Sequence, residues 1–501
     1  MTARIILAEQ EYRDRVYACW LGKNIGGTLG APDETKKYTH SLTYYDPLPD
    51  KSAPNDDLDL QLVWLVMLEK EGLPPRLADF GRYWSTYLWR YPWNEYGFCS
   101  RNLARGLMPP ISGWFENYYV DEMGSPIRSE LWACIAPADP QTAASLAWMD
   151  SALDHAGGEG TYGEMFWAAV ESAGFVLSDP LELIRIGLAM IPPACAISRV
   201  IREVVWCWQH GIRYDDARER VTRIYWNEQP CNAIPNHGYT VAGWLYGQDF
   251  GDRLCKAVNC GFDTDCTGAT LGALLGILGG TGGIPRQWSD PIGAEIVLHE
   301  FTGDCGVPRS LGDLTDRTVA LARRLAEING GPTAFGAAAS LPADLRTSLY
   351  RNEKAFAALA QDVRCGSAVD RDLELFLHYH GDPVLYPGIA RRMSLTCRLH
   401  GVEVQPELAL LEGPVGWQAE PVDVGDGLAW DVTPPAYEQA VQLKITVSVQ
   451  GAAYNAAFTV LSPNEAQGYP NGVQSTVWQP GMAAVPASGK RVEISFGPRG
   501  A

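Results

Sequence analysis

The chain has 501 residues, several times the commonest domain size, so it is long enough for more than one folded unit. Hydrophobic residues make up 46% and charged residues 20%, which excludes a charge-rich disordered chain. Forty Lys and Arg against 59 Asp and Glu leave a formal net charge of −19, which opposes binding to nucleic acid or anionic lipid. We therefore expect neither nucleic acid nor a membrane as a partner.

Helical spacing of apolar residues dominates the first two thirds of the chain. The predicted helices are Glu11–Gly30, Leu58–Glu71, Gln141–His155, Gly163–Gly174, Leu181–His210, Tyr214–Tyr225 and Leu311–Ile328. Strand-like alternation is scarce there, so we predict an all-α domain over residues 1–342.

The character of the sequence changes towards its C-terminal end. Residues 343–390 are polar and partly helical, and we interpret them as a connector. Residues 391–501 contain short runs rich in Val, Thr and aromatic residues, separated by Pro and Gly. This pattern predicts a small β-sandwich domain, so the fold class expected is mainly α with an accessory β domain.

The twelve cysteines form no pattern typical of structural zinc, since none stands in a CxxC pair. Most lie in apolar helical text, where a free thiol packs as a small hydrophobe, as expected in a reducing compartment. The first residues contain too short an apolar run for a signal peptide, and no later run is long enough to span a bilayer. These features predict a cytoplasmic protein.

Three polar residues, Asn55, Asp56 and Asp57, stand directly before the predicted helix that begins at Leu58. Asn and Asp often cap helices, but one residue suffices for that purpose. A row of oxygen donors also forms a plausible half of a Mg²⁺ or Mn²⁺ site. Capping and metal binding both remain open for this segment.

A second acidic segment, Asp263-Thr264-Asp265-Cys266-Thr267, follows Gly261 and precedes a helix rich in small residues. An Asp-x-Asp beside hydroxyl and thiol groups resembles a loop that binds a hard cation, although an Asx-turn with a helix cap is an alternative.

Glycines recur every four residues in the first predicted helix and in the helix after the second acidic segment. They are Gly22, Gly26 and Gly30, and Gly268, Gly272 and Gly276. Each costs about 1 kcal/mol of helix propensity relative to Ala, so we expect close approach of other backbone to both helices. That approach would bring the acidic ends together, but tight core packing alone explains the spacing equally well.

These segments together resemble the ADP-ribosylglycohydrolase family, which includes the dinitrogenase reductase-activating glycohydrolases, the ADP-ribosyl-arginine and ADP-ribosyl-serine hydrolases and the J1 crystallins. The family has a Gly-spaced first helix ending in Glu, a Thr/Ser-Asp-Asp segment and a late Gly-Asp-Thr-Asp-Thr loop. Here these correspond to WLGKNIGGTLGAPDE ending in Glu34, to NDD at 55–57 and to GFDTDCTG at 261–268. The match in order, spacing and context covers roughly residues 12–330.

The resemblance implies an all-α fold with a binuclear Mg²⁺ or Mn²⁺ centre and hydrolysis of an ADP-ribosyl C1–N or C1–O bond. It implies as metal ligands Asn55, Asp56, Asp57, Asp263, Asp265 and Thr267. Mg²⁺ prefers oxygen ligands, and a metal pair can position a diol and activate water. Glu34 falls where the family has a glutamate near the reacting centre, so Glu34 and Asp56 are candidate catalytic residues.

Three departures from the family pattern affect this assignment. Asn55 replaces a hydroxyl residue, and Gly27 lacks an Asp that many members carry. Cys266 stands where the family has a ligand threonine, and sulfur is a poor partner for Mg²⁺. We expect Thr267 to supply the missing oxygen, with the alternative that water fills the position and Cys266 only packs.

The middle of the chain has the general pattern of the family's substrate loops. The candidate substrate residues are Arg128, Ser129, His155, Tyr162 and Gly163. Arg128 can bind phosphate or pair with an acid, and His155 can contact substrate or complement a helix dipole. Glu164 and His155 are further candidates for acid/base catalysis, although Glu164 also suits the first turn of a helix.

Residues 82–98 contain eight aromatic side chains interleaved with Arg82, Arg90, Asn94 and Glu95. Such a stretch usually belongs to a core, but a cleft built this way also suits an adenine ring or a sugar. Three hypotheses follow: a metal-dependent hydrolase of ADP-ribosyl or related glycosyl substrates, a hydrolase of the same fold for a different furanoside or nucleoside-like small molecule, and a non-catalytic crystallin-like or binding protein. The acidic residues retained argue against the third, and the sequence does not fix the oligomeric state.

Overall fold

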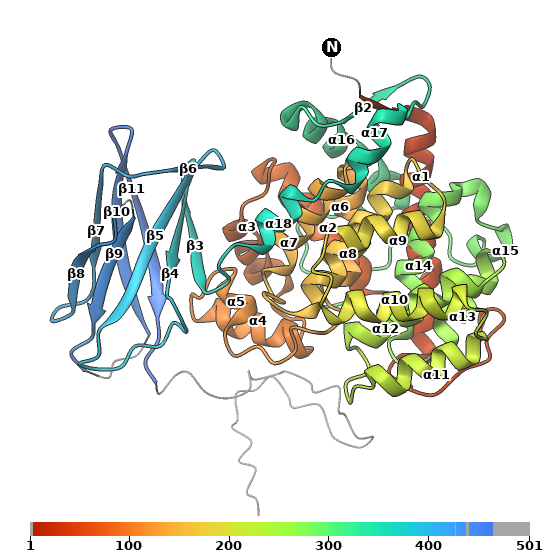
Figure 1. Ribbon diagram of the computed structural model, residues 1–501, viewed down its shortest axis with the longest axis horizontal. Coiled ribbons are helices and arrows are strands. Elements are labelled where there is room, and N and C mark those ends of the chain that lie inside the picture. The colour runs from red at the N-terminus through yellow and green to blue at the C-terminus, as the bar shows by residue number, and fades with distance from the viewer. Residues whose placement is uncertain (1–3, 426, 437–439, 464–501) are drawn as a thin grey trace, which may run out of the picture.

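The computed structural model describes residues 4–425, 427–436 and 440–463. A helical body formed by most of the chain lies beside a β-rich body formed by its later part (Figure 1). The predicted fold class, mainly α with an added β domain, is confirmed. Residues 464–501 of the predicted sandwich domain lie outside the described residues. Within those residues, no helix is long and apolar enough to cross a membrane.

The helical body has helices at all seven predicted ranges and further helices that the sequence did not predict. Its α-helices are α1 Glu9–Gly30, α2 Asp56–Glu71, α3 Leu77–Tyr83, α4 Asn94–Ala104, α5 Ile111–Trp114, α6 Ser129–Ile135, α7 Pro140–Ser151, α8 Glu159–Gly174, α9 Pro180–Ala189, α10 Ala196–Gln209, α11 Tyr214–Tyr225, α12 Ala233–Tyr246, α13 Phe250–Asn259, α14 Thr264–Gly279, α15 Arg286–Ser289 and α16 Leu311–Asn329. Shorter helical turns are Ala31–Asp33, Trp84–Leu88, Pro126–Arg128 and Thr281–Gly283. The predicted helix Leu181–His210 is instead two helices, α9 and α10, because Pro192 and Pro193 lie between them and proline interrupts the helical hydrogen bonds.

The glycines of α1 and α14 allow these two helices to touch backbone to backbone. A Cβ added to Gly26 would lie 1.9 Å from the carbonyl oxygen of Gly268, and one on Gly22 would lie 2.0 Å from that of Gly272. At Gly30 the clash would be with the Thr264 carbonyl, at 2.1 Å. The predicted close approach is therefore confirmed, and it places the C-terminal end of α1 against the N-terminal end of α14.

The β-rich body consists of two antiparallel sheets. Its strands are β3 Cys365–Asp370, β4 Leu373–His378, β5 Arg391–Leu399, β6 Val402–Val404, β7 Leu408–Glu412, β8 Gln418–Asp423, β9 Leu428–Thr433, β10 Val441–Val449 and β11 Ala452–Val460. One sheet has the order β11-β10-β7 and the other β3-β4-β5-β9-β8, with β6 also paired to β5. Along β10, Leu443, Ile445 and Val447 are buried and alternate with more exposed residues, as in a strand with one face on a core.

Two of these strands fall inside residues 343–390, the segment interpreted from sequence as a connector. β3 and β4 pair with each other, and β4 pairs with β5. Helices α17 Ala343–Arg346 and α18 Glu353–Leu359 and the turn Thr347–Tyr350 precede them. A two-stranded parallel sheet, β1 Ile5–Ala8 with β2 Thr333–Gly336, joins the two ends of the helical body. The boundaries at 342 and 390 stay predictions.

The core of the β-rich body extends into the helical body. Leu107, Ile111 and Phe115, from the chain around α5, are buried in the same cluster as the side chains between the two sheets. Figure 1 shows α4 and α5 on the side of the helical body that faces the strands. The β-rich body is thus anchored by a segment that directly follows α4.

Candidate active site

A cavity of about 220 Å³ opens where the N-terminal ends of α2 and α14 meet the chain that follows α1. Glu34, Asp56, Asp263 and Asp265 line one part of it. The aromatic stretch contributes Trp93, Asn94, Glu95 and Tyr96, and Met123, Cys231 and His299 complete much of the remaining wall. The cavity therefore joins both predicted acidic segments to the start of α4.

Local structure explains why the acidic side chains converge. Asn55 caps α2, its side-chain oxygen accepting from the Asp57 N–H at 2.9 Å, so Asp56 and Asp57 lie in the first turn. Asp263 precedes the first turn of α14, and its N–H donates to Asn236 Oδ1 at 3.2 Å. Both sets of carboxylates therefore lie at helix N-termini, whose dipoles favour negative charge.

The loop that carries Glu34 is tied to the second acidic segment by paired backbone hydrogen bonds. The Thr35 N–H donates to the Phe262 carbonyl at 2.8 Å, and the Phe262 N–H donates to the Lys36 carbonyl at 2.9 Å. Thr35 and Phe262 both adopt positive φ angles, 69° and 72°. This pairing holds Glu34 against Asp263.

Two groups of side chains have ligand atoms within 4.8 Å of one another: Asp57, Asp265 and Cys266, and Glu34, Cys231 and Asp263. In the first group, Cys266 Sγ lies 3.7 Å from Asp57 Oδ2. Asp56 is the first residue of α2 and contacts α4, from which the Tyr96 hydroxyl donates to its Oδ2 at 3.2 Å.

The carboxylates of this site have raised pKa values. Burial and the neighbouring charges raise the pKa values of Asp263 and Asp265 well above the ordinary range, and burial does the same for Asp57. Glu34 is exposed as a whole residue, but surrounding protein atoms enclose its carboxylate and, with the charges of Asp56 and Asp57, raise its pKa to about 7.

The site's donor set fits a hard divalent cation. Asp57 Oδ1, both carboxylate oxygens of Asp263 and Asp265 Oδ1 are buried without a hydrogen-bond partner among the described residues. Lys23 Nζ, the neighbouring ammonium, lies 3.7 Å from Asp57 Oδ1 but only 2.8 Å from Glu130 Oε1. Buried carboxylates without compensating partners are costly, and a cation that prefers oxygen ligands removes that cost.

The structure separates Cys266 from Thr267. The Thr267 hydroxyl is buried and donates to the Thr264 carbonyl of its own helix at 3.1 Å, whereas Cys266 lines the cavity. The assignment of Thr267 as a ligand stays a prediction, and the thiol is the side chain directed at the carboxylates.

Several predicted substrate residues lie behind the cavity wall. Arg128 is fully buried, and its guanidinium pairs with Asp154 at 2.8 Å and Asp150 at 3.0 Å. Ser129 is buried at the start of α6, and Gly163 packs within α8 against His237. Tyr162 is half-buried, and neither it nor Ser129 is among the residues that line the cavity.

The two residues predicted for acid/base catalysis, Glu164 and His155, are also buried behind the residues that line the cavity. Glu164 is fully buried and accepts a hydrogen bond from Ser125 Oγ. His155 is buried, with Nδ1 2.8 Å from Asp154 Oδ1 and Nε2 3.7 Å from Glu95 Oε1. The roles of both residues stay predictions, and Glu95 is the carboxylate between His155 and the cavity.

Sequence reasoning did not assign Glu95, Cys231 or His299 to the site. Glu95 stood in the aromatic stretch, whose mixture of rings and polar groups was the one signal available for it. His299 reaches the cavity from a loop before α16, and its N–H donates to Asp59 Oδ2 at 2.7 Å. No motif surrounds Cys231 or His299, so only the fold reveals them.

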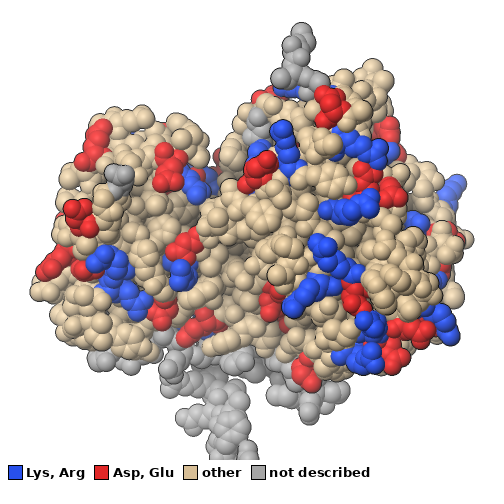
Figure 2. All heavy atoms as spheres, in the orientation of Figure 1, with Lys and Arg blue, Asp and Glu red and all other residues tan. Residues whose placement is uncertain are grey.

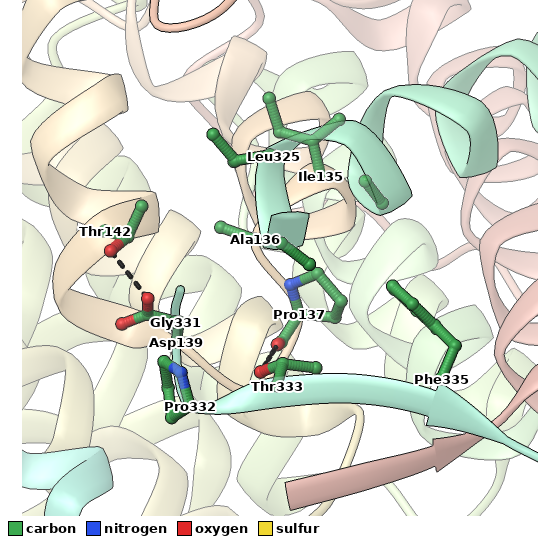
Figure 3. Close-up of a pocket in the computed structure, with 12 residues that line it drawn as sticks. Ile135, Ala136, Pro137, Asp139, Thr142, Leu325, Gly331, Pro332, Thr333 and Phe335 are labelled. Carbon is green, nitrogen blue, oxygen red and sulfur yellow. Dashed lines mark hydrogen bonds between the residues drawn. The ribbon is translucent and has the colours of Figure 1, made fainter. Parts of the chain in front are cut away.

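A second pocket is far smaller. It lies between the C-terminal end of α6, α16 and β2, has a volume of about 20 Å³ and is lined mainly by apolar side chains such as Ile135, Leu325 and Phe335 (Figure 3). That space suits about one water molecule. Two further pockets, of about 520 and 310 Å³, are larger than the acidic cavity. The acidic cavity is the candidate active site because both acidic segments line it.

Comparison with known proteins agrees with this location. The family model for ADP-ribosylglycohydrolase matches residues 8–327, which include every acidic residue of the cavity. The chain belongs to the ADP-ribosylglycohydrolase family. Family membership supports a glycohydrolase, and the acidic groups described above are the candidate metal-binding groups.

A solved structure described as an ADP-ribosylglycohydrolase-related protein complex is 20% identical, with a TM-score of 0.44, over 63% of this chain and 99% of that chain. No curated protein matches the chain.

Proposed function

We propose that this protein is a divalent-metal-dependent glycoside hydrolase that cleaves the C1–N or C1–O bond of an ADP-ribosyl or related ribosyl or glycosyl substrate. The observation that carries the proposal is the set of buried carboxylate oxygens of Asp57, Asp263 and Asp265 that have no hydrogen-bond partner among the described residues, beside an open cavity. A crystallin-like or binding protein has no need of such a costly arrangement.

Asp56, Asp57, Asp263 and Asp265 would hold two Mg²⁺ or Mn²⁺ ions, with Cys266 or Thr267 as the additional side chain under test. When bound, such ions orient sugar hydroxyls and lower the pKa of a coordinated water. Asn55 contributes by capping α2, which fixes the direction of Asp56 and Asp57.

Hydrolysis needs one group that accepts a proton from water and another that protonates the leaving atom. Glu34 is suited to the first role, because its carboxylate lines the cavity beside Asp263 and can accept a proton. Glu95 is suited to the second, because burial and the neighbouring Glu122 raise its pKa well above the usual range and keep it protonated. The bond from C1 to the leaving atom breaks, water supplies the new C1–O bond, and the leaving group departs with a proton.

His155 acts in this scheme as a positioning residue. Its Nδ1 is held by Asp154, which Arg128 holds in turn, so Nε2 is directed at Glu95. Glu164 and Ser129 are buried behind the cavity wall as well, and they would affect the reaction only by holding the residues that line the cavity.

The test is hydrolysis by the full chain after treatment with a chelator. ADP-ribosylated arginine, ADP-ribosylated serine and a panel of furanosides and pyranosides are incubated with and without Mg²⁺ or Mn²⁺. We expect hydrolysis of at least one substrate that requires the metal, with Glu34→Gln losing turnover while metal binding is retained. Hydrolysis of none of them, or turnover by Glu34→Gln equal to wild type, would contradict the proposal.

A further inference from the structure

A buried lysine lies directly behind the acidic segment of α2. Lys23, on α1, is 1% exposed, and it is not among the residues that line the cavity. Its Nζ lies 3.7 Å from Asp57 Oδ1, an oxygen that has no hydrogen-bond partner among the described residues. Within those residues, no other Lys or Arg forms an ion pair with Asp56, Asp57, Asp263 or Asp265. Lys23 is therefore a counter-charge that the protein itself supplies to this group of carboxylates.

Hydrogen bonds fix the position of the Lys23 ammonium. Its Nζ donates to Glu130 Oε1 at 2.8 Å and to the Ile127 carbonyl at 2.9 Å. Gln61 holds Glu130 in turn, since its Nε2 donates to Glu130 Oε2 at 2.8 Å. Glu130 is fully buried, so the pair is shielded from solvent. The ammonium is thus held beside Asp57 by groups that do not belong to the acidic segments.

The two carboxylate oxygens of Asp57 have different neighbours. Oδ1 is the oxygen near Lys23, whereas Oδ2 lies 3.7 Å from Sγ of Cys266, which lines the cavity. A divalent ion bound by Asp57 therefore shares this carboxylate with a fixed positive charge, and like charges repel strongly where burial reduces screening by water. When no ion is bound, the same ammonium offsets the cost of burying Asp57. Lys23 thus acts in opposite directions on the metal-bound and the metal-free protein.

We infer that Lys23 sets the affinity of the metal centre: its ammonium stabilises the metal-free site and weakens the binding of a divalent ion at Asp57. Lys23 does not line the cavity, so it acts through Asp57 as a positioning residue and is not a catalytic one. This inference rests on the proposed divalent-metal centre and adds what controls how tightly that centre holds its ions. A protein built this way stays folded when the ions leave, so its activity would follow the concentration of free ion.

The first experiment compares variants that remove opposite charges from the same buried pair. Mn²⁺ is titrated by calorimetry into the chelator-treated full chain of wild type, Lys23→Met and Glu130→Gln. Lys23→Met should bind Mn²⁺ about tenfold or more tightly than wild type, the scale on which groups around a metal site act. Glu130→Gln leaves the ammonium with Asp57 as its remaining ion-pair partner among the described residues, so it should bind Mn²⁺ more weakly than wild type.

The opposite signs of these two changes distinguish a charge effect from structural damage. If the Lys23–Glu130 pair only held the fold together, both variants would bind Mn²⁺ more weakly than wild type. Weaker or unchanged binding by a folded Lys23→Met therefore overturns the inference, and so does tighter binding by Glu130→Gln.

A double variant keeps the test decisive if Lys23→Met alone does not fold. Lys23→Met/Glu130→Gln removes both charges together, which costs less stability than leaving one buried charge unpaired. It differs from Glu130→Gln only at Lys23, so it should bind Mn²⁺ about tenfold or more tightly than that variant, and equal affinity of the two overturns the inference. Lys256→Met, which breaks an ion pair with Asp252 on α13, is the control and should bind Mn²⁺ like wild type.

Thermal unfolding gives a second readout that involves no substrate. Lys23→Met should have a lower melting temperature than wild type without metal, and saturating Mn²⁺ should raise its melting temperature by more than it raises that of wild type. An equal or smaller rise overturns the inference. If these shifts are seen but no glycoside is hydrolysed, the inference stands and only the proposed hydrolase activity fails. Absence of Mn²⁺ binding by both wild type and Lys23→Met overturns the two together.

Discussion

Cys266 and Thr267 are adjacent in sequence but have different surroundings. The thiol lies 3.7 Å from the Asp57 carboxylate, while the Thr267 hydroxyl is satisfied by the Thr264 carbonyl. A thiol is a softer donor than an alcohol and favours softer ions than Mg²⁺. A sulfur ligand would therefore change the preferred metal.

Paired substitutions separate the two residues. We expect Cys266→Ala to change the ratio of Mn²⁺ to Mg²⁺ affinity by about tenfold or more, the scale on which groups around a metal site act. Thr267→Val should leave that ratio unchanged. Calorimetric titration of both ions into the chelator-treated variants measures it. If Thr267→Val weakens Mg²⁺ binding and Cys266→Ala does not, Thr267 is the ligand, as the sequence predicted.

Glu122 gives a prediction about pH. It is buried beside the cavity wall, and burial raises its pKa to about 8. Between its ordinary pKa near 4.3 and this value the folded protein holds the proton more firmly than the unfolded chain, so its contribution to stability falls as pH rises.

Glu122→Gln should remove that dependence. The free energy of unfolding of wild type minus that of Glu122→Gln should decrease between pH 5 and pH 8, by up to about 1.4 kcal/mol for each pH unit. Urea denaturation of metal-free protein measures the difference, with Glu219→Gln, at an exposed position on α11, as the control. Parallel curves for wild type and Glu122→Gln would show that Glu122 is not held in its protonated form.

At the scale of elements, the contact between α1 and α14 builds the acidic site. Because Gly26 and Gly268 touch through their backbones, the Glu34 loop and Asp263 are brought within reach of each other. The same helix, α14, ends at Gly279, where an added Cβ would meet no atom within 4 Å. One helix pair therefore offers both a test position and a control.

Gly26→Ala should destabilise the protein by about 1–3 kcal/mol or more, since a methyl group must displace rigid backbone. It should also weaken divalent-metal binding by separating the two acidic segments. Gly279→Ala should be neutral or stabilise by up to about 1 kcal/mol, because alanine has the better helix propensity. Thermal unfolding and metal titration of both variants check this, and equal stability of the two would contradict the packing role.

The sequence predicted the helices whose apolar periodicity is strong, such as α11 and α16, but not α3 to α6, α12, α13 or α15. It predicted one helix across Pro192 and Pro193 because the apolar spacing continues through the break. It singled out the acidic residues of the cavity because each acidic segment is contiguous in sequence, although the two segments lie about 200 residues apart. Tertiary packing brings Glu95 to the cavity on α4 and His299 on a long loop. Local sequence patterns do not predict such packing.

At the scale of the whole molecule, the formal charge of −19 is not gathered into one patch on the face shown in Figure 2. Acidic and basic side chains are interspersed there over both bodies. Several carboxylates, among them those proposed to bind metal, are concentrated in the cavity instead.

The anchoring of the β-rich body also belongs to this scale. Leu107, Ile111 and Phe115 lie in its core, and the chain around them continues directly from α4, which carries Glu95. The Phe115 carbonyl accepts from Asn102 Nδ2 at 2.7 Å, which ties the anchor to the C-terminal turns of α4. The β-rich body thus supports one wall of the cavity.

Phe115→Ala should cost about 3–5 kcal/mol of stability, as expected for a buried phenylalanine. It should also raise KM and lower kcat, because α4 forms one wall of the cavity and carries Glu95, the proposed proton donor. Tyr118→Ala, in the same loop but 71% exposed, is the control and should cost little. Denaturation and steady-state kinetics measure both effects, and wild-type KM in a destabilised Phe115→Ala would show that the β-rich body does not support the cavity.

The proposed hydrolase activity depends most on the binding of two divalent ions by the carboxylates at the N-terminal ends of α2 and α14. The most direct measurement is anomalous diffraction from crystals soaked in Mn²⁺. We predict two peaks about 3.5–4 Å apart, the spacing of two-metal hydrolytic sites, beside Asp56, Asp57, Asp263 and Asp265. Absence of both peaks at millimolar Mn²⁺, in crystals whose cavity is open to solvent, would contradict the account.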